Sequence, residues 1–200
     1  MALWSPERYF SRITDIDIER DLLAPGYTHV LLDIDNTIRA RDTHAVPRDV
    51  GMWLGRARTA GVQFCLVSNN WHADAHDFAA QMELPLVAKA MKPLPPAFFA
   101  GMRKLGARRS DTVVIGDQLT TDVLGAHCAG LPAYMLQPLV KQDLKHTKVL
   151  RVLESAILGD RQPEPAVNAT ADAGVSGPEA IPGRPAAAVV RAQPAPAHEE

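Results

Sequence analysis

The sequence Val30–Thr37, VLLDIDNT, places two aspartates directly after an apolar run. The three apolar residues at its start predict a buried β-strand, and the aspartates stand two positions apart where that strand ends. Carboxylates are among the side chains least often buried without a partner, because removing their charge from water is unfavourable. Asp33 and Asp35 therefore require a metal ion, a basic partner or a catalytic role, and they are the first candidates for a functional site.

Short apolar runs alternate with helical patterns on both sides of this stretch. The runs predict five strands, Thr28–Asp35, Val62–Val67, Leu86–Ala88, Thr112–Gly116 and Ala133–Leu136. The patterns predict helices over Pro47–Ala60, Ala73–Met82, Pro95–Leu105 and Thr121–Ala129, and a last one from about Thr147 to Leu158. This alternation is typical of a mainly parallel sheet covered by helices on both faces. We therefore expect an α/β fold, a three-layer sandwich around a five-stranded sheet.

The composition is that of a folded domain followed by a tail. The chain has 200 residues, 46% of them hydrophobic and 22% charged, and a formal net charge of −2. This charge gives no reason to expect binding to nucleic acid. From Gly159 onward the chain has no aromatic residue and is rich in Pro and Ala, so it buries too little apolar area to become ordered. We expect a domain over residues 1–158 and a disordered Pro/Ala-rich tail over residues 159–200.

Features of the chain also bear on its location. No apolar run is long enough to span a bilayer, and the N-terminus lacks the basic start and apolar stretch of a signal peptide. Cys65 and Cys128 fall within a predicted strand and a predicted helix, and we expect both to be buried thiols. Two unpaired buried thiols are typical of a reducing cytoplasm.

Polar residues stand where each predicted strand ends. Asp33 and Asp35 follow the first strand, and Ser68–Asn70 follows the second. Gly116–Asp122, GDQLTTD, follows the fourth strand, and Lys92 comes shortly before the third helix. Because the carboxyl ends of parallel strands meet at one edge of a sheet, we expect these side chains to converge there.

This set of side chains is complete for phosphoryl transfer through a covalent intermediate. A carboxylate attacks phosphorus only when repulsion between the two anions is suppressed, and Mg²⁺, which prefers oxygen ligands, does this. Asp33, Asp35 and Asp117 supply such oxygens. Lys92 supplies a positive charge, and Ser68 donates a hydrogen bond to the phosphoryl oxygens together with the backbone N–H groups after it. Hydrolysis of the aspartyl-phosphate then requires a second carboxylate as acid and base, and Asp35 is close enough to serve.

With these motifs, residues 28–136 resemble the haloacid dehalogenase-like (HAD) phosphatases. Four signatures of that family are matched in order, by Asp33–Thr37, by Ser68, by Lys92, and by Asp117 with Asp122. One such motif alone would be weak, but four in the right order at the expected strand ends make a strong case. The resemblance implies a HAD-like Rossmannoid fold and Mg²⁺ as the cofactor.

The resemblance also implies roles for single residues. It makes Asp33 the nucleophile and Asp35 the general acid/base. It implies that Asp35 binds the metal ion through its main-chain carbonyl, and that Asp122 contacts the ion directly or through water. We expect Asn69 and Thr37 to contact the substrate.

Four motifs together look like the YqeG branch of HAD subclass IIIA: Asp35–Thr37, Ser68–Asn70, Ala90–Pro93 and Gly116–Asp122. That branch is similar to the mitochondrial phosphatidylglycerophosphate phosphatase of cardiolipin synthesis. The chain departs from the branch in two places. Trp71–Asp74 stands where a basic residue is expected, and Ala126–Cys128 stands in place of Gly-Asn-Arg. Both departures remove positive charge that we expect near the site.

Short inserts bear on the substrate. About thirty residues separate Thr37 from Ser68, and the segment between Ser68 and Lys92 holds one helix and one short strand, so neither gap has room for a large cap domain. A site without a lid suits a phosphorylated substrate whose body stays outside, such as a lipid head group, a protein or a polymer end. A small sugar phosphate would need an oligomeric partner to close the site.

The N-terminal segment raises the question of peripheral membrane contact. Four residues could form one apolar stripe of a short helix, next to Arg8 and Arg12: Trp4, Tyr9, Phe10 and Ile13. Aromatic residues beside basic ones suit a membrane interface. We expect this stripe to pack on the sheet instead, because the segment is short and acidic.

The sequence thus predicts a Mg²⁺-dependent phosphomonoester hydrolase, with phosphatidylglycerophosphate as the first substrate to consider. A phosphatase of a soluble or protein phosphate is an alternative. A non-enzymatic module that is phosphorylated on aspartate as a signal, like a receiver domain, is another. A receiver needs no acid/base carboxylate beside its aspartate, so Asp35 favours an enzyme. The intact set of motifs argues against a degenerate scaffold.

Overall fold

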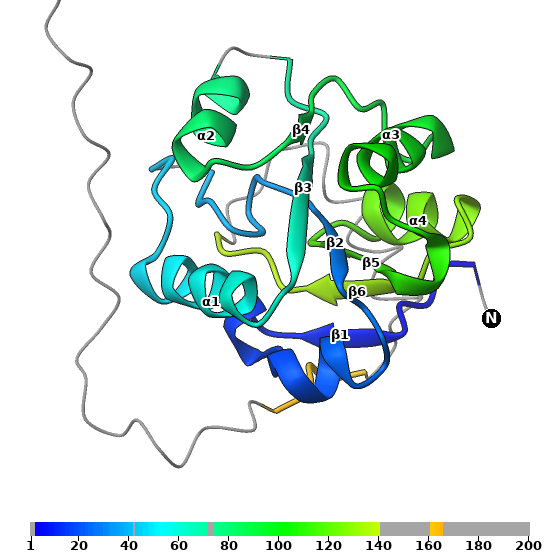
Figure 1. The fold of residues 1–200 in the computed structure, drawn as a ribbon. Coiled ribbons are helices and arrows are strands. Elements are labelled where there is room, and N and C mark those ends of the chain that lie inside the picture. The colour runs from blue at the N-terminus through cyan, green and yellow to red at the C-terminus, as the bar shows by residue number, and fades with distance from the viewer. Residues whose placement is uncertain (1–2, 42, 72–73, 141–160, 166–200) are drawn as a thin grey trace, which may run out of the picture.

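Six parallel strands form one sheet in the order β1-β6-β5-β2-β3-β4 (Figure 1). The computed structural model describes residues 3–41, 43–71, 74–140 and 161–165. The strands are β1 (Arg8–Phe10), β2 (His29–Leu32), β3 (Gln63–Val67), β4 (Leu86–Val87), β5 (Thr112–Gly116) and β6 (Ala133–Leu136). The α/β class and the parallel sheet are confirmed. The expected number of five strands was wrong, because β1 adds a sixth at one edge.

The helices lie between the strands, close to the predicted ranges. They are α1 (Arg48–Thr59), α2 (Asp74–Met82), α3 (Pro95–Leu105) and α4 (Leu124–Cys128). Short helical segments are η1 (Ile13–Asp15), η2 (Ile18–Leu23), η3 (Arg109–Asp111) and η4 (Leu119–Val123). The helix expected over residues 121–129 is thus divided into η4 and α4. The helix expected over residues 147–158 lies outside the described residues.

Two helices cover each face of the sheet, which makes three layers (Figure 1). Helices α1 and α2 pack on one face, where Trp53 and Phe78 join the larger core cluster. Helices α3 and α4 pack on the other face, where Phe98 belongs to the second cluster. Because strand side chains alternate between faces, Leu32 belongs to the first cluster and Leu31 to the second.

Local sequence explains where the helices begin and end. In α1 the buried residues stand at helical spacing: Val50, Trp53, Leu54 and Ala57. Helix α3 begins at Pro95, which suits a first helical position because it has no N–H to satisfy. It ends before Gly106, whose φ of 66° is the left-handed conformation that glycine adopts most easily.

The N-terminal segment forms a strand where a helical stripe was expected. Arg8–Phe10 pairs in parallel with β6, with Phe10 opposite Leu136. Strand geometry sends Tyr9 and Phe10 to opposite faces of the sheet, so they belong to different core clusters. The expectation that this segment packs with the sheet is nevertheless met, because both aromatic side chains are buried.

Residues 161–165 return to the outer edge of the sheet. The backbone N–H of Glu164 donates to the carbonyl of Tyr9 at 2.7 Å, and the Glu164 carboxylate pairs with the Arg8 guanidinium. Arg8 also donates to the buried Asp21 at 2.6 Å. These residues lie beyond the expected domain boundary at 158, which otherwise stays a prediction.

The two thiols differ in their surroundings. Cys65 is buried on β3, whereas Cys128 at the end of α4 is exposed, so the expectation of two buried thiols was wrong for Cys128. The expectation fails for Cys128 because a surface helix has one buried face and one exposed face, and Cys128 lies on the exposed face of α4.

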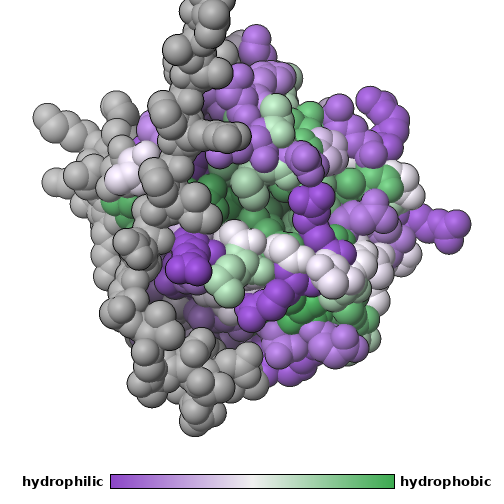
Figure 2. All heavy atoms as spheres, turned by 60° about the vertical axis from the view of Figure 1, so that its left-hand side comes forward, coloured by the Kyte–Doolittle hydropathy of each residue, from purple (hydrophilic) through white to green (hydrophobic). Residues whose placement is uncertain are grey.

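The face of the described residues seen in Figure 2 is mixed in polarity. Figure 2 shows hydrophilic residues projecting furthest, with apolar residues visible mainly between them. Over the same residues, no helix combines the length and apolar character needed to cross a membrane.

Candidate active site

Three adjacent strands bring the predicted residues to one edge of the sheet. Asp33 directly follows β2, and its N–H donates to the carbonyl of Ile115 on β5 at 2.9 Å. Ser68 follows β3 on one side of β2, and Asp117 follows β5 on the other side. The convergence expected from parallel strands is therefore present in the structure.

A cluster of three buried aspartates lies at the centre of this edge. Asp33, Asp117 and Asp122 each offer a carboxylate oxygen, and these oxygens all lie within 4.8 Å of one another. Lys92 Nζ donates to Asp33 Oδ1 at 2.5 Å and to Asp122 Oδ1 at 2.7 Å. Thr37 Oγ1 donates to the other oxygen of Asp33 at 3.2 Å. One ammonium group thus holds two of the three carboxylates.

Burial and mutual repulsion make the ionised cluster unfavourable without further positive charge. Burial raises the pKa of Asp33 to about 6, against the opposing effect of Lys92. Burial also raises the pKa of Asp117 well above its usual value, and the charges of Asp33 and Asp122 add to the effect. Burial alone would lower the pKa of Lys92, but Asp122 and Asp33 outweigh it and raise that pKa.

The donor set fits a divalent cation. Asp117 Oδ1 is buried and has no hydrogen-bond partner among the described residues. A buried carboxylate oxygen without a partner is unfavourable, and a cation shared with Asp33 and Asp122 would satisfy it. Carboxylate oxygens are the ligands that hard cations such as Mg²⁺ prefer. When bound, such an ion would neutralise negative charge on the cluster and on a phosphate group.

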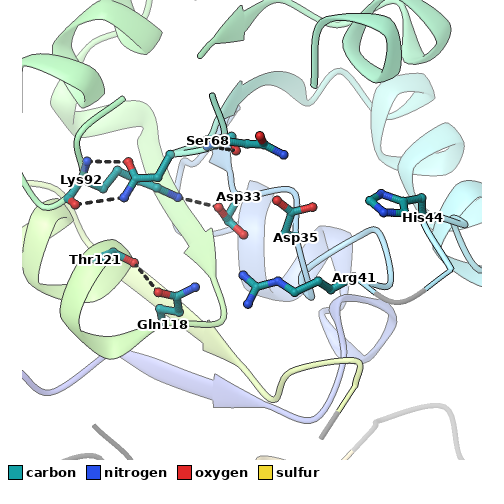
Figure 3. Close-up of a pocket in the computed structure, with 10 residues that line it drawn as sticks. Asp33, Asp35, Arg41, His44, Ser68, Lys92, Gln118 and Thr121 are labelled. Atoms are coloured by element: carbon teal, nitrogen blue, oxygen red, sulfur yellow. Dashed lines mark hydrogen bonds and ion pairs between the residues drawn. The ribbon is translucent and has the colours of Figure 1, made fainter. Parts of the chain in front are cut away.

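Asp35 lies beside this cluster but has a different partner. Arg39 donates to Asp35 Oδ1 at 2.6 Å and to Asp74 Oδ2, at the start of α2, at 3.2 Å. The Arg39 side chain is only 3% exposed. Figure 3 shows the Asp35 carboxyl group next to that of Asp33. Sequence reasoning did not identify Arg39, which no motif marks.

Two residues expected to contact the substrate are bonded to other site residues. The side chain of Asn69 accepts from the Lys92 N–H at 2.7 Å and donates to the Lys92 carbonyl at 3.1 Å. Thr37 is buried and bonded to Asp33. These contacts suit a role in positioning Lys92 and Asp33, whereas substrate contact by Asn69 and Thr37 stays a prediction.

Ser68 is buried directly after β3. Its Oγ accepts a hydrogen bond at 3.0 Å from the backbone N–H of Asn70. This bond fixes the turn that follows the strand and orients the hydroxyl near Asp33, as Figure 3 shows.

An open cavity of about 340 Å³ lies over these groups (Figure 3). Its lining includes Gln118 and Thr121 from the predicted Gly116–Asp122 motif, and two residues that sequence reasoning missed, Arg41 and His44. The expected loss of positive charge is therefore offset by Arg41, from a different loop. His127, which was expected near the site, instead contacts Glu7 at the amino end of β1, at 3.1 Å. A basic residue a few positions after the first motif is the signal that could have indicated Arg41.

A parallel sheet with a buried aspartate cluster and a lysine at its carboxyl edge is an α/β architecture whose site can hold a cation and an anionic group. The haloacid dehalogenase-like hydrolase family matches residues 3–130. The chain belongs to this family, and it is an enzyme of the HAD phosphatase type.

Individual proteins are also similar to this chain. The chain is 32% identical over 154 residues to the probable phosphatase YqeG of Bacillus subtilis strain 168, covering 76% of this chain and 88% of the relative. Among solved structures, it is similar to the cobalt-bound deoxy-D-mannose-octulosonate 8-phosphate phosphatase (YrbI) of Haemophilus influenzae. That likeness has a TM-score of 0.47 and 15% identity, over 67% of this chain and 88% of that one. The chain is also similar to a putative HAD hydrolase of subfamily III A from Legionella pneumophila. That likeness has a TM-score of 0.43 and 15% identity, over 56% of this chain and 65% of that one.

Proposed function

We propose that this chain is a Mg²⁺-dependent phosphomonoester hydrolase that forms an aspartyl-phosphate on Asp33. The observation that supports this most is the position of the Asp33 carboxylate. It is held by Lys92 and Thr37, belongs to the cluster that fits a divalent cation, and has Asp35 beside it. The oxygen ligands of the ion would be Asp33, Asp117 and Asp122, with the Asp35 carbonyl as the family resemblance implies.

In the first step, an Asp33 oxygen attacks phosphorus and the bond from phosphorus to the ester oxygen breaks. Asp35 gives its proton to that leaving oxygen, so the alcohol departs neutral. Lys92 and Ser68 lie where they can donate to the phosphoryl oxygens. In the second step Asp35 takes a proton from water, the water oxygen attacks phosphorus, and the bond to Asp33 breaks. Phosphate leaves, and both carboxylates return to their starting states.

Phosphatidylglycerophosphate is the substrate we propose to test first. The similarity to YqeG supports placement in subclass IIIA, and the described residues between the motifs include no cap domain. Large apolar side chains next to pocket residues also support a substrate with an apolar body. Trp71 is 66% exposed and Met91 is 59% exposed, and they flank Asn70 and Lys92 in the sequence. Such a protein would work at the cytoplasmic surface of a membrane, through peripheral contact.

Substitution of the nucleophile tests the mechanism. Asp33→Asn should abolish Mg²⁺-dependent phosphate release from p-nitrophenyl phosphate, because an amide oxygen does not form the covalent intermediate. Asp35→Asn should slow turnover by about 10²- to 10⁴-fold, the usual contribution of a general acid/base. Asp77→Asn makes the same chemical change on the exposed face of α2 and should leave the rate unchanged. Activity retained by Asp33→Asn would exclude the mechanism.

A substrate panel tests the lipid assignment separately. Purified protein is assayed on phosphatidylglycerophosphate in mixed micelles, on sugar phosphates and on a phosphopeptide. The lipid should give the highest kcat/KM. Efficient hydrolysis of a soluble phosphate with none of the lipid would rule out the lipid as substrate and leave the reaction class intact.

A further inference from the structure

Arg41 differs from Lys92 and Arg39 in having no carboxylate partner within the part of the chain that the structure describes. Lys92 is bonded to Asp33 and Asp122, and Arg39 is bonded to Asp35 and Asp74. The guanidinium of Arg41 lines the same cavity, yet forms no ion pair or hydrogen bond with another described residue. Burial raises the pKa of Asp117, and the positive charge of Arg41 acts in the opposite direction. The Arg41 charge therefore interacts with the aspartate cluster at the centre of the site.

Backbone bonds within residues 36–45 shape the loop that carries Arg41. The N–H of Asn36 donates to the Arg39 carbonyl at 2.8 Å. The N–H of Ala40 donates to the Ala45 carbonyl at 3.0 Å, and the N–H of His44 donates to the Ala40 carbonyl at 2.9 Å. Arg41 and His44 therefore stand on a small closed turn next to the nucleophile loop.

Arg41 and His44 lie on the side of the site where the leaving group must be. Figure 3 shows Lys92 on one side of Asp33 and His44 on the opposite side, beyond Asp35, while the Arg41 side chain extends so that its guanidinium lies next to Asp33 and Asp35. The acid that protonates the leaving oxygen faces the leaving group, so the body of the substrate extends past Asp35. Along that path the Arg41 guanidinium lies beside Asp35, and the His44 ring, whose side chain is 61% exposed, lies beyond it.

We infer that Arg41, with His44 beside it, binds a second anionic group on the leaving-group side of the substrate. The inference rests on the proposed function, because it uses Asp35 as the acid. The substrate class is a phosphomonoester that also carries a phosphodiester, a carboxylate or a second phosphate a few bonds away. A guanidinium suits this role because its planar donors match the oxygens of carboxylate and phosphate.

Two matched substrates test the inference. Glycerol 3-phosphate and 3-phosphoglycerate share a three-carbon skeleton and a phosphomonoester, and the second adds a carboxylate. We expect wild-type kcat/KM to favour 3-phosphoglycerate by about 10- to 100-fold, the range for a hydrogen bond between charged groups. The preference should shrink at high salt, because an exposed charge pair is screened.

Variants assign the preference to Arg41. Arg41→Ala should remove most of the preference for 3-phosphoglycerate over glycerol 3-phosphate, and Arg41→Lys should retain part of that preference. Arg56→Ala removes an exposed arginine from α1 outside the cavity and should keep the wild-type preference. The deacylated head group of phosphatidylglycerophosphate carries both a phosphomonoester and a phosphodiester. Comparing it with the intact lipid tells a soluble source of the second anion from a membrane source, and the Arg41→Ala loss should appear with each.

Two results would overturn the inference. One is a wild-type enzyme that hydrolyses both three-carbon substrates with equal kcat/KM. The other is an Arg41→Ala variant whose kcat/KM falls by the same factor on both substrates. That result would show that Arg41 contacts the phosphate that is cleaved. A wild-type enzyme inactive on every phosphomonoester would contradict the proposed function instead.

Discussion

Arg39 and Asp35 form a short ion pair, 2.6 Å from nitrogen to oxygen, at the edge of the catalytic cavity. The same nitrogen of Arg39 reaches Asp74 at 3.2 Å, and the guanidinium lies 5.1 Å from the centre of the Phe78 ring. Asp74 and Phe78 both belong to α2. The carboxylate that we propose as acid and base is therefore oriented by a helix that carries no motif residue.

Removing this link should affect both stability and turnover. Arg39→Met leaves the carboxylates of Asp35 and Asp74 without their common partner. We expect the free energy of unfolding to fall by about 1.5–3 kcal/mol, the range for hydrogen bonds to charged groups. We also expect kcat to fall with little change in KM, because Asp35 loses its orientation.

Urea unfolding and steady-state kinetics on the Arg39 variants check this prediction. Arg39→Lys should recover part of kcat, since it keeps a positive charge. Arg56→Met is the matched control on the exposed face of α1 and should leave both measurements unchanged. An Arg39→Met variant that loses stability but keeps wild-type kcat would assign Arg39 a structural role only.

Gly116 should not tolerate a side chain. A Cβ at this position would lie 2.3 Å from Cγ of Asp122, so Gly116→Ala must displace that carboxylate from Lys92. We expect kcat to fall by about 100-fold, because a displacement of roughly 1 Å at a reacting group has effects of that size. The protein should still fold, which circular dichroism checks.

Gly55→Ala is the control for this substitution. A Cβ at Gly55 in α1 meets nothing within 4 Å. Alanine is the better helix former, so this variant should be as active as wild type and up to about 1 kcal/mol more stable. Wild-type activity of Gly116→Ala would argue against Asp122 as a site residue.

Metal binding should show as a change in thermal stability. The ionised form of Asp117 is unfavourable without metal, since burial and the charges of Asp33 and Asp122 raise its pKa. Asp117→Asn should therefore raise the Tm of the EDTA-treated protein and abolish the rise in Tm that Mg²⁺ gives the wild type. A ligand present at 100 times its Kd stabilises by about 2.7 kcal/mol.

Scanning fluorimetry with EDTA and then with increasing Mg²⁺ makes this measurement. Asp77→Asn should keep the full Mg²⁺-dependent rise in Tm. EDTA should also abolish wild-type turnover, and Mg²⁺ should restore it. A rise of wild-type size in Asp117→Asn would exclude Asp117 as a metal ligand.

The ion pairs of Asp21 should make stability depend on pH. Burial alone would raise the pKa of Asp21, but hydrogen bonds from Arg20 and Arg8 outweigh it and lower that pKa. A lowered carboxyl pKa stabilises the fold above the unfolded value, 3.8, and this contribution is lost as the pH falls through the folded value. Asp21→Asn should be less stable than wild type at pH 7 by about 1.5–3 kcal/mol.

Urea unfolding of both proteins at pH 7 and in the acid range checks the sign. The difference in unfolding free energy should be largest at pH 7 and should shrink below about pH 4, where the wild-type carboxyl becomes protonated. A difference that grows in acid would contradict the assignment.

Elements with strong local signals were predicted well from the sequence. Helix α3 has the expected bounds, Pro95–Leu105, because proline marks its start and glycine follows its end. Strand β5 also has its expected range, Thr112–Gly116, because a continuous apolar run ends at glycine. Strand β1 was missed because three residues give too little alternation to tell a strand from a helix, and only pairing with β6 defines it.

The residues of the site also differ in how well the sequence predicted them. Asp33 and Asp117 were identifiable because a carboxylate directly after an apolar strand has no place in a core. Arg39 was not, because its importance depends on a contact with a residue distant in the sequence. Arg41 was missed because a basic residue a few positions after the first motif is a weak signal, and only the folded loop places it at the cavity. Arg39 meets Asp74 across 35 positions, and no local pattern encodes such a pairing.

The covered edge of β1 has a consequence for handling the protein. A free edge strand presents unpaired N–H and C=O groups that readily accept a strand from another molecule. At one end of the sheet this hazard is small, because β4 has only two residues. At the other end Glu164 occupies the edge through its bond to Tyr9. A protein truncated at residue 158 would lose that cover, so we expect it to self-associate through β1 while its catalytic edge stays intact.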